Sequence, residues 1–371
     1  MGNIRGIRYL AFGCILVIST SLFLQGCDQH VALASAEKLP SEITVHFAIP
    51  PEPEPPLELP PRKQLSDEEI LQCYWRWYEL LGIKLPPGEN KHQMKVSPAM
   101  YDEQTWTFTR GVGGVDESEN VVSFVDMDLD ASTGALYVLF NHAVWDELYK
   151  LPAGTQPTKT REVILEEASK YLKLIIGDLA DNFRVDHDYS RWESRGGRTD
   201  LKGYWWINWY RVMNGYKVDT MGDGINMDIH EEYGLIAFTF SMRSLPCPTE
   251  VKITEEQAKK IAATALPIII QRCPHLCPPM KVKGQKLTEC ELCIINPYYI
   301  FSQGVSSIWT YLNNRHTRLA YRISFWVFGE KENWGYKLVV DVDAATGEII
   351  GGNYTKGEKA QLSSSIETTP K

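Results

Sequence analysis

Three copies of one short pattern, each closed by a glycine, constrain the fold of this chain more than any single motif. The copies run from Asp128 to Leu136, from Asp228 to Ile236 and from Asp341 to Ile349. Alternating apolar residues flank each copy, which indicates a strand, a tight turn and a second strand. Glycine supplies the positive φ that the turn needs, and an acidic side chain can cap the turn's backbone donors. The turn residues that we predict are Asp130, Gly134, Gly234, Asp343 and Gly347.

A helix signal stands upstream of every copy. Ser66 to Glu69 and Thr254 to Gln257 are capping boxes, with a hydroxyl and a carboxylate or amide three residues apart. We expect helices over 70–81, from Thr160 to about residue 176, and from 258 to about 270. The predicted fold class is therefore α+β, with three tandem repeats that each pack a helix on an antiparallel sheet.

The N-terminus predicts a lipoprotein signal peptide over residues 1–27. Arg5 and Arg8 precede an apolar stretch that is short for a membrane span, and Leu24-Gln-Gly-Cys27 follows. This end resembles a lipobox, in which Cys27 is acylated after cleavage. The alternatives are an ordinary secretory signal and an uncleaved anchor. We therefore expect an extracytoplasmic protein that is attached to the cell membrane by its lipid.

The rest of the chain divides by composition. Residues 28–63 are rich in proline and glutamate, so we expect a disordered, semi-rigid tether there. The repeats are assigned to residues 64–150, 151–248 and 249–356, and the third carries a cysteine-rich insertion at 273–293. Residues 357–371 are predicted to be a disordered tail. A net charge of -9 argues against nucleic acid as a partner.

The repeated unit resembles the PepSY domain and the larger YcdB/YcdC repeat of bacterial cell-envelope lipoproteins. The likeness rests on the helix start at Thr254 to Lys260, on Trp334 to Asp341 before the third turn, and on Trp209-Tyr-Arg211 with Asn214-Gly-Tyr216 in the second repeat. PepSY domains are associated with extracytoplasmic proteins and with propeptides that inhibit peptidases. The resemblance thus implies a binding or inhibitory role.

Four cysteines form two close pairs in the insertion of the third repeat, Cys273 with Cys277 and Cys290 with Cys293. Four thiolates at this spacing could bind a tetrahedral zinc ion. An oxidising compartment favours disulfides instead, and the mature chain has an even number of cysteines beyond Cys27. A redox-active pair is a third interpretation. In the two main interpretations the cluster stabilises an irregular insertion.

Other chemical signals are weaker. Acidic residues alternate at 126, 128 and 130, which places carboxylates on one strand face and could bind calcium, although turn capping explains them as well. The aromatic run from Tyr204 to Tyr210 favours a central strand in the core over a stacking platform. Gly111 to Gly114 is predicted to be a hairpin loop.

The sequence contains no His-Glu-x-x-His, Gly-x-Ser-x-Gly or Walker motif. We therefore expect a non-catalytic, membrane-anchored binding or regulatory lipoprotein whose partner is a protein or peptide of the cell envelope. It is expected to need no cofactor, apart from zinc if the cysteine cluster binds it. The alternatives are a cell-envelope hydrolase with a site between repeats and a structural spacer.

Overall fold

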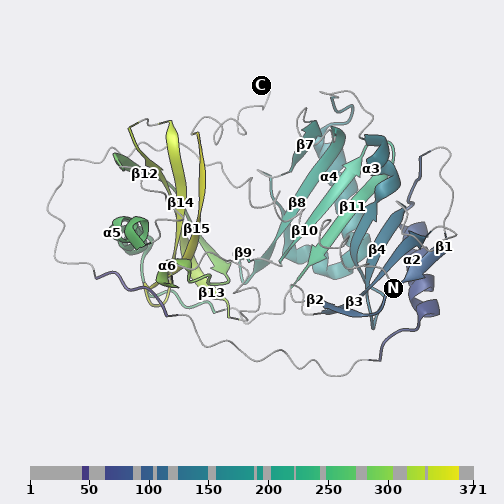
Figure 1. Cartoon of the computed structure of the whole chain (residues 1–371), viewed down its shortest axis with the longest axis horizontal. Helices are drawn as coiled ribbons and strands as arrows, with labels where there is room; N and C mark the ends of the chain where they lie inside the picture. Colours follow the sequence, from purple (N-terminus) through teal and green to yellow (C-terminus); the bar gives the residue numbers. More distant parts are fainter. Residues whose placement is uncertain are drawn as a thin grey trace. The chain divides into compact units, whose positions relative to one another are not determined.

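The computed structural model describes residues 44–49, 63–86, 93–102, 107–115, 124–148, 156–187, 190–194, 202–220, 223–242, 248–272, 282–303, 316–330 and 333–358. The chain forms two compact units (Figure 1). The central unit spans Glu54–Pro246, and the C-terminal unit joins Cys247–Lys371 to Met1–Pro53. Each unit is an antiparallel sheet with a few helices.

The sheet of the central unit has the strand order β1-β3-β4-β5-β11-β10-β8-β9, with β2 paired to β3 and with β6 and β7 paired to β8. Its strands are β1 (Gln93–Val96), β2 (Met100–Asp102), β3 (Thr107–Val115), β4 (Val125–Asp130), β5 (Leu136–Asn141), β6 (Phe183–Val185), β7 (Arg191–Ser194), β8 (Lys202–Met213), β9 (Tyr216–Asp219), β10 (Gly224–His230) and β11 (Gly234–Ser241). Its helices are α2 (Asp67–Leu80), α3 (His142–Leu148), α4 (Arg161–Ile176) and the 3-10 helix η1 (Gly177–Asn182).

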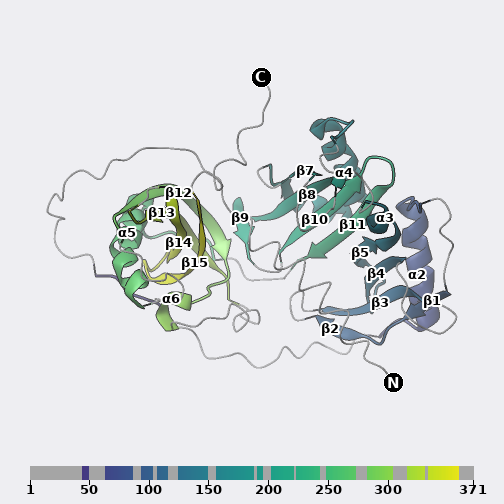
Figure 2. The ribbon, with the colours of Figure 1, turned by 45° about the horizontal axis from the view of Figure 1, so that its top comes forward.

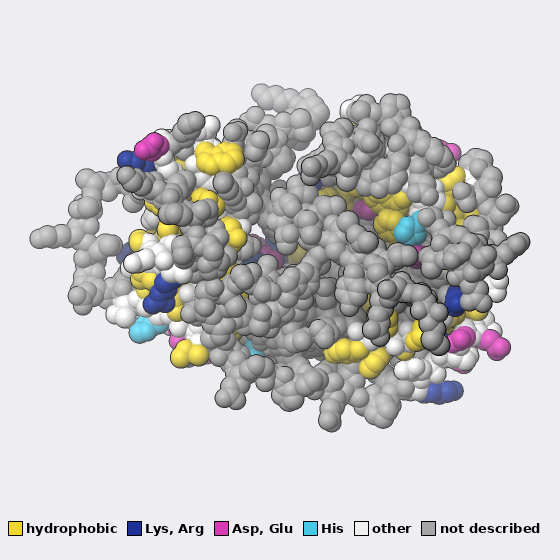
Figure 3. Space-filling view, in the orientation of Figure 1, with side chains coloured by type: hydrophobic (Ala, Val, Ile, Leu, Met, Phe, Trp, Pro, Cys, Tyr) yellow, Lys and Arg dark blue, Asp and Glu magenta, His cyan; other side chains and the backbone are white. Residues whose placement is uncertain are grey.

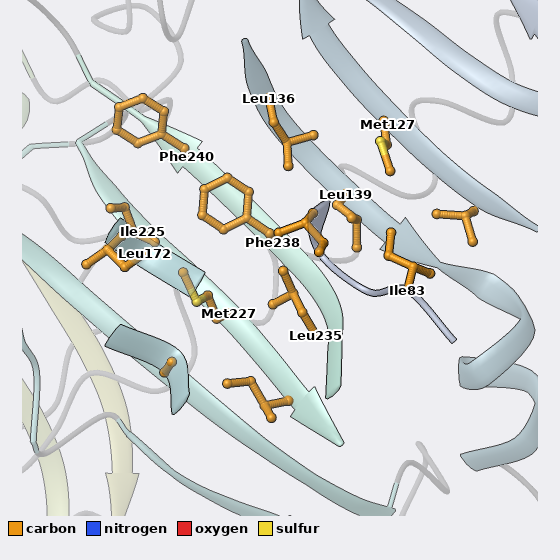
Figure 4. Packing of buried hydrophobic residues seen from close by; sticks show 14 of the residues in the cluster. Ile83, Met127, Leu136, Leu139, Leu172, Ile225, Met227, Leu235, Phe238 and Phe240 are labelled. Carbon is orange, nitrogen blue, oxygen red and sulfur yellow. The ribbon is translucent and has the colours of Figure 1, made fainter. Parts of the chain in front are cut away.

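One sheet and one core serve both of the first two predicted repeats. Strand β5 pairs with β11 through Leu139 and Phe238, which also lie beside each other in the core (Figure 4). The same hydrophobic cluster contains Tyr74 of α2 and Leu172 of α4. The boundary that we placed after residue 150 therefore falls inside one compact unit, because edge strands of two helix-on-sheet segments have joined.

The helices of the central unit cover two faces of this sheet. Ile164, Ala168 and Leu172 form an apolar stripe at a spacing of four residues, by which α4 packs on the core. Helix α3 packs instead on Ala237, which points away from its neighbour Phe238 because successive strand residues alternate between faces.

The aromatic run in β8 behaves as a central strand. Trp205, Ile207 and Trp209 are buried in the core, and the alternate residues Trp206 and Tyr210 are half-buried on the other face. The prediction of core packing is confirmed for these three residues. By contrast, the predicted hairpin loop at Gly111 to Gly114 is wrong, since these residues lie within β3.

The C-terminal unit is a four-stranded antiparallel meander in the order β12-β13-β14-β15 (Figure 2). Its elements are α5 (Glu255–Arg272), β12 (Gly284–Ile295), α6 (Ile300–Gln303), β13 (Arg318–Phe328), β14 (Trp334–Asp343) and β15 (Ile349–Glu358). Helix α5 buries Ala258, Ala262 and Ile269 on one side. Residues 44–49 differ from the predicted tether, because Phe47 forms a parallel bridge to Ile349 of β15.

Both predicted capping boxes are present. The Ser66 hydroxyl accepts the Glu69 N–H at 3.2 Å, and the Glu69 carboxylate accepts the Ser66 N–H at 2.7 Å. Thr254 and Gln257 repeat both bonds at the same two distances. The three predicted helices exist as α2, α4 and α5, each beginning directly after its N-cap position.

Candidate functional site

Several predicted residues lie outside the described part of the chain. These are residues 1–27 with the lipidation site Cys27, most of the tether, the tail beyond residue 358, and Cys273 and Cys277. None of the helices in the described ranges has the length and apolar composition that a membrane span requires.

Cys290 and Cys293 lie on one strand, β12, but their side chains do not converge. They are three positions apart on the strand, so their side chains leave opposite faces of the sheet. Cys293 is buried in a cluster with Tyr299 and Ile350, and Cys290 lies near the charges of α5, with its pKa raised to about 11 by burial. The interpretation in which this pair forms half of a four-cysteine zinc site needs both thiols on one side, and strand geometry does not supply that. Pairing with Cys273 or Cys277 stays a prediction.

The glycine turns have the geometry that the pattern predicts. In the first, one Asp130 carboxylate oxygen accepts the N–H groups of Ser132 at 2.9 Å and Thr133 at 2.7 Å, and Gly134 has a φ of 71°. Burial alone would raise the pKa of Asp130, but these bonds and the two hydroxyls outweigh it and lower the pKa.

The third and second turns repeat this arrangement. Asp343 accepts the N–H groups of Ala345 at 2.8 Å and Thr346 at 2.9 Å. In the second turn the Nδ1 atom of His230 takes the place of the carboxylate oxygen and accepts the N–H groups of Glu232 at 3.1 Å and Tyr233 at 3.2 Å. A β-bulge also recurs two residues before Asp130, His230 and Asp343.

Each turn glycine lies against a helix of its own segment. A methyl group at Gly134 would lie 2.4 Å from Cys73 Sγ of α2, and one at Gly234 would lie 2.7 Å from Tyr171 Oη of α4. At Gly347 the nearest atom would be Ile261 Cδ1 of α5, at 3.3 Å. The turns therefore position the helices, which makes these predicted residues structural.

The chain segment before each helix is fixed to the turn as well. The N–H of Leu65 donates to the Ala131 carbonyl at 2.8 Å, and the N–H of Ile253 donates to the Ala344 carbonyl at 3.1 Å. In the second segment the Glu231 carboxylate accepts the Lys159 N–H at 2.9 Å instead. A side chain thus replaces a backbone group at the same point of the fold.

The outer edge of β15 holds an extended segment of this same chain. The Ala48 N–H donates to the Ile349 carbonyl at 3.0 Å, and the Ile349 N–H donates to the His46 carbonyl at 2.8 Å. Strand β15 ends the strand order of its unit, so this edge would otherwise present unpaired backbone groups. The segment, drawn in purple, lies beside α6 in Figures 1 and 2.

Side chains fix the segment on both faces of the sheet. The Arg272 guanidinium at the end of α5 lies 4.6 Å from the centre of the Phe47 ring. Ala48 is buried in the cluster of Cys293 and Tyr299 on the other face, whereas Ile49 is 88% exposed. Ala48 and Ile49 also form one wall of a cleft of about 480 Å³.

The cleft beside the segment is lined by charged groups of both signs. Lys252 and Arg318 contribute positive charge, and Glu250, Asp343 and Glu348 contribute negative charge. On the face shown in Figure 3, the described lysine and arginine side chains lie singly and do not form one basic patch. The arrangement suits a peptide, which has backbone donors and acceptors, better than a polyanion.

A second polar cluster lies on the central unit. The Nε2 atom of His142 lies 3.1 Å from Asp126 Oδ2, and Phe140 and Trp145 stack beside it. Gly113 leaves room for the Asp126 carboxylate, since a methyl group there would lie 2.9 Å from Oδ1.

Among the described residues, no three histidine, cysteine or acidic side chains gather as a metal site requires. The calcium hypothesis therefore has no ligand set in that part of the chain. Asp341, the counterpart of Asp128 in the C-terminal unit, has another role. Asp341 is fully buried and accepts two bonds from Arg322, at 2.9 Å and 3.1 Å.

Sequence reasoning missed Phe47, Arg272 and the pair of Asp126 with His142. The prolines around residues 44–49 outweighed the short run Val45-His-Phe-Ala-Ile49, whose apolar residues are the only signal of a strand there. The ring of Phe47 and the guanidinium of Arg272 are far apart in sequence, so no local spacing connects them.

No protein-family model matches the chain, and no curated protein matches it. Among solved structures, the chain is similar to the C-terminal domain of YpeB from Bacillus megaterium, with a TM-score of 0.37 and 14% sequence identity. The similarity covers 79% of this chain and 98% of that chain. At this TM-score the likeness supports no argument about function, and the relation to PepSY domains stays a prediction.

Proposed function

We propose that this chain is a lipid-anchored, extracytoplasmic binding protein that recognises extended peptide segments of an envelope protein at the outer edge of β15. The observation that supports it is the parallel bridge between Phe47 and Ile349. A strand edge that accepts one extended segment offers the backbone groups for strand addition, and side-chain contacts on the two faces give specificity. The proposed role is regulatory and non-catalytic, and modulation of a peptidase is its specific form.

The net free energy that holds residues 46–48 on β15 is small enough for another peptide to replace them. Two backbone hydrogen bonds contribute about 1 kcal/mol each, and an exposed cation–π contact contributes about 0.5–1 kcal/mol. Ordering the backbone of residues 46–48 costs about 1–2 kcal/mol per residue. The two sides nearly balance, so a peptide with a few more contacts along β15 can take the same edge.

The architecture in this proposal is three PepSY-like copies of one unit. The supporting observations are the turn bonds at Asp130, His230 and Asp343, the recurrent bulge and the helix against each turn glycine. Two copies share the sheet of the central unit, and the third forms the C-terminal unit.

Attachment through Cys27 is a separate part of the proposal, and it rests on the sequence. Labelling cells with a fatty-acid analogue should mark the wild-type protein, and the Cys27→Ser variant should lose the label and leave the membrane fraction. A labelled Cys27→Ser protein would contradict the assignment of Cys27.

Peptide binding is tested by amide hydrogen exchange of the full chain with a panel of extended peptides. A ligand at the edge should protect backbone amides of β15, and peptides with proline at alternate positions should not. Inhibition of an envelope peptidase by the same chain would identify the specific form of the role. If no peptide at millimolar concentration protects β15, the proposed function is wrong.

The rival function, an envelope hydrolase, is favoured by one observation. The Asp126 carboxylate orients the His142 ring as a general base requires, beside the half-buried ring of Phe140 and the buried ring of Trp145. If the protein hydrolyses an envelope peptide or glycan, His142→Gln should abolish turnover and leave binding at β15 unchanged.

A further inference from the structure

We propose that residues 44–49 are a built-in pseudo-ligand, which occupies the edge of β15 and must leave before a partner peptide binds. This inference rests on the proposed function and adds to it a ligand motif and a means of control. The segment has the backbone pairing that a ligand would have, and its pairing to Ile349, its ring contact with Arg272 and the cluster around Ala48 all lie within the C-terminal unit.

The contacts of the segment define the motif. Phe47 and Ala48 point to opposite faces of the sheet, so each meets a different site. Phe47 meets the Arg272 guanidinium, which favours an aromatic ring because of the attraction between a cation and a π face. Ala48 is 8% exposed in an apolar cluster, which favours a small residue.

Val45 is half-buried, whereas the exposed positions around this pair add little to recognition. Thr44 and His46 have exposed side chains, and His46 contributes its carbonyl. Ile49 is 88% exposed. The motif is therefore an extended segment with an aromatic residue followed by a small one, and a partner protein that presents it competes with residues 44–49.

Occupation by the chain's own segment sets the strength of this competition. Residues 44–49 and β15 belong to one chain, so the segment competes at an effective concentration, for which we take about 1 mM as the order of magnitude. For a peptide whose intrinsic Kd is about 0.1 mM, the edge would then be open about one tenth of the time. The apparent Kd of an external peptide rises by the same factor, about tenfold.

The test uses the full chain in three forms. In Ala48→Pro the N–H that donates to Ile349 is absent, so the segment cannot dock. Ile49→Pro is the matched control, because it places proline at the next residue, whose side chain is exposed. The probe is a fluorescein-labelled synthetic peptide with the sequence of residues 44–50, and its binding is measured by fluorescence anisotropy.

We expect Ala48→Pro to bind the probe about tenfold more tightly than the wild type, and Ile49→Pro to bind it as the wild type does. Amide exchange should show the Ile349 N–H protected in the wild type and in Ile49→Pro but not in Ala48→Pro. Peptides with alanine in place of Phe47, or aspartate in place of Ala48, should bind Ala48→Pro at least tenfold more weakly than the probe.

The opposite outcomes separate the two proposals. Equal affinity in all three forms would refute self-occupation but leave the peptide edge in place. If the altered peptides bind as well as the probe, the motif is wrong. No binding by Ala48→Pro, with its Ile349 amide exposed, would refute the peptide edge itself and with it the proposed function.

Discussion

Replacing Gly134 by alanine tests whether the glycine turns position the helices. Gly134 has a φ of 71°, and the added methyl would lie 2.4 Å from Sγ and 3.0 Å from Cβ of Cys73. The Sγ atom belongs to helix α2, which is fixed at its start by a capping box. Relief of the contact therefore requires the turn and the helix to separate.

Two costs add in the Gly134→Ala variant. Left-handed backbone costs a residue with a Cβ about 1–2 kcal/mol, and forcing an extra methyl into a packed site costs about 1–3 kcal/mol. Gly82→Ala is the control, because Gly82 lies just after α2, has a φ of 59°, and has nothing within 4 Å of the added methyl. In this control only the cost of the left-handed backbone should reduce stability. Gly347→Ala should cost about as much as the control, measured in the transition of the C-terminal unit, since the flexible end of Ile261 lies 3.3 Å away.

The assay is calorimetric unfolding of the full chain, in which the transition of the central unit is followed. For a unit of this size each kcal/mol lowers Tm by about 2–4 °C, so Gly134→Ala should lower it by about 4–20 °C and Gly82→Ala by about 2–8 °C. In a Cys73→Ala background the difference between the two glycine variants should shrink, because Sγ is absent. Equal losses at Gly134 and Gly82 in the wild-type background would refute the packing argument.

Three further measurements address other groups. Burial lowers the pKa of His230 below 6.5, so below that pH the unfolded chain binds more protons than the folded chain does. The central unit should therefore lose stability from about pH 6.5 downward, and His230→Asp should remove this slope between pH 7 and pH 5. Asp341→Asn leaves Arg322 buried without its ion-pair partner and should cost about 3–5 kcal/mol, measured by urea unfolding, while loss of the exposed pair of Lys170 with Glu166 should be undetectable. Because the pKa of Cys290 is raised to about 11, its native thiol should react with iodoacetamide at pH 8 about 100-fold more slowly than a thiol with a pKa of 9, and a rate equal to that of the denatured protein would contradict this.

Local chemistry explains what the sequence predicted correctly. A capping box and a glycine with positive φ each act within four residues of chain. So does an aspartate that accepts the backbone N–H groups of the residues two and three positions further on. Such signals do not depend on the partner strand. The starts of α2, α4 and α5 and the turns at Gly134, Gly234 and Gly347 could therefore be located from the residues alone.

Strand pairing at long range could not be predicted in this way. The joining of β5 to β11 depends on Leu139 and Phe238, which are ordinary apolar residues in ordinary strands. Nothing local distinguishes a strand that ends a sheet from one that continues it. The docking of residues 44–49 could not be predicted for the same reason, because two hydrogen bonds and the burial of Ala48 decide it.

Cys290 and Cys293 show what residue spacing leaves open when the local structure is unknown. Two residues between Cys290 and Cys293 bring thiols together in a loop, where the chain can turn back on itself. On the extended strand β12 the same spacing sends them to opposite faces. The motif is the same in both cases, and only the backbone decides its chemistry.

The three turns also separate positions that hold the fold from positions that are free to vary. Opposite the acid two residues before each cap, the neighbouring strand carries Gly111, Trp206 or Arg322. The next position along the same strand carries Arg110, Trp205 or Tyr321, and there each side chain reaches the segment before its helix or the Glu231 carboxylate that binds this segment. The second of these positions thus keeps its structural role while its residue changes. The first position keeps neither its residue nor a shared role. Specific functions of the three copies should therefore be sought on the face of Gly111, Trp206 and Arg322 and at the sheet edges, where the fold imposes least.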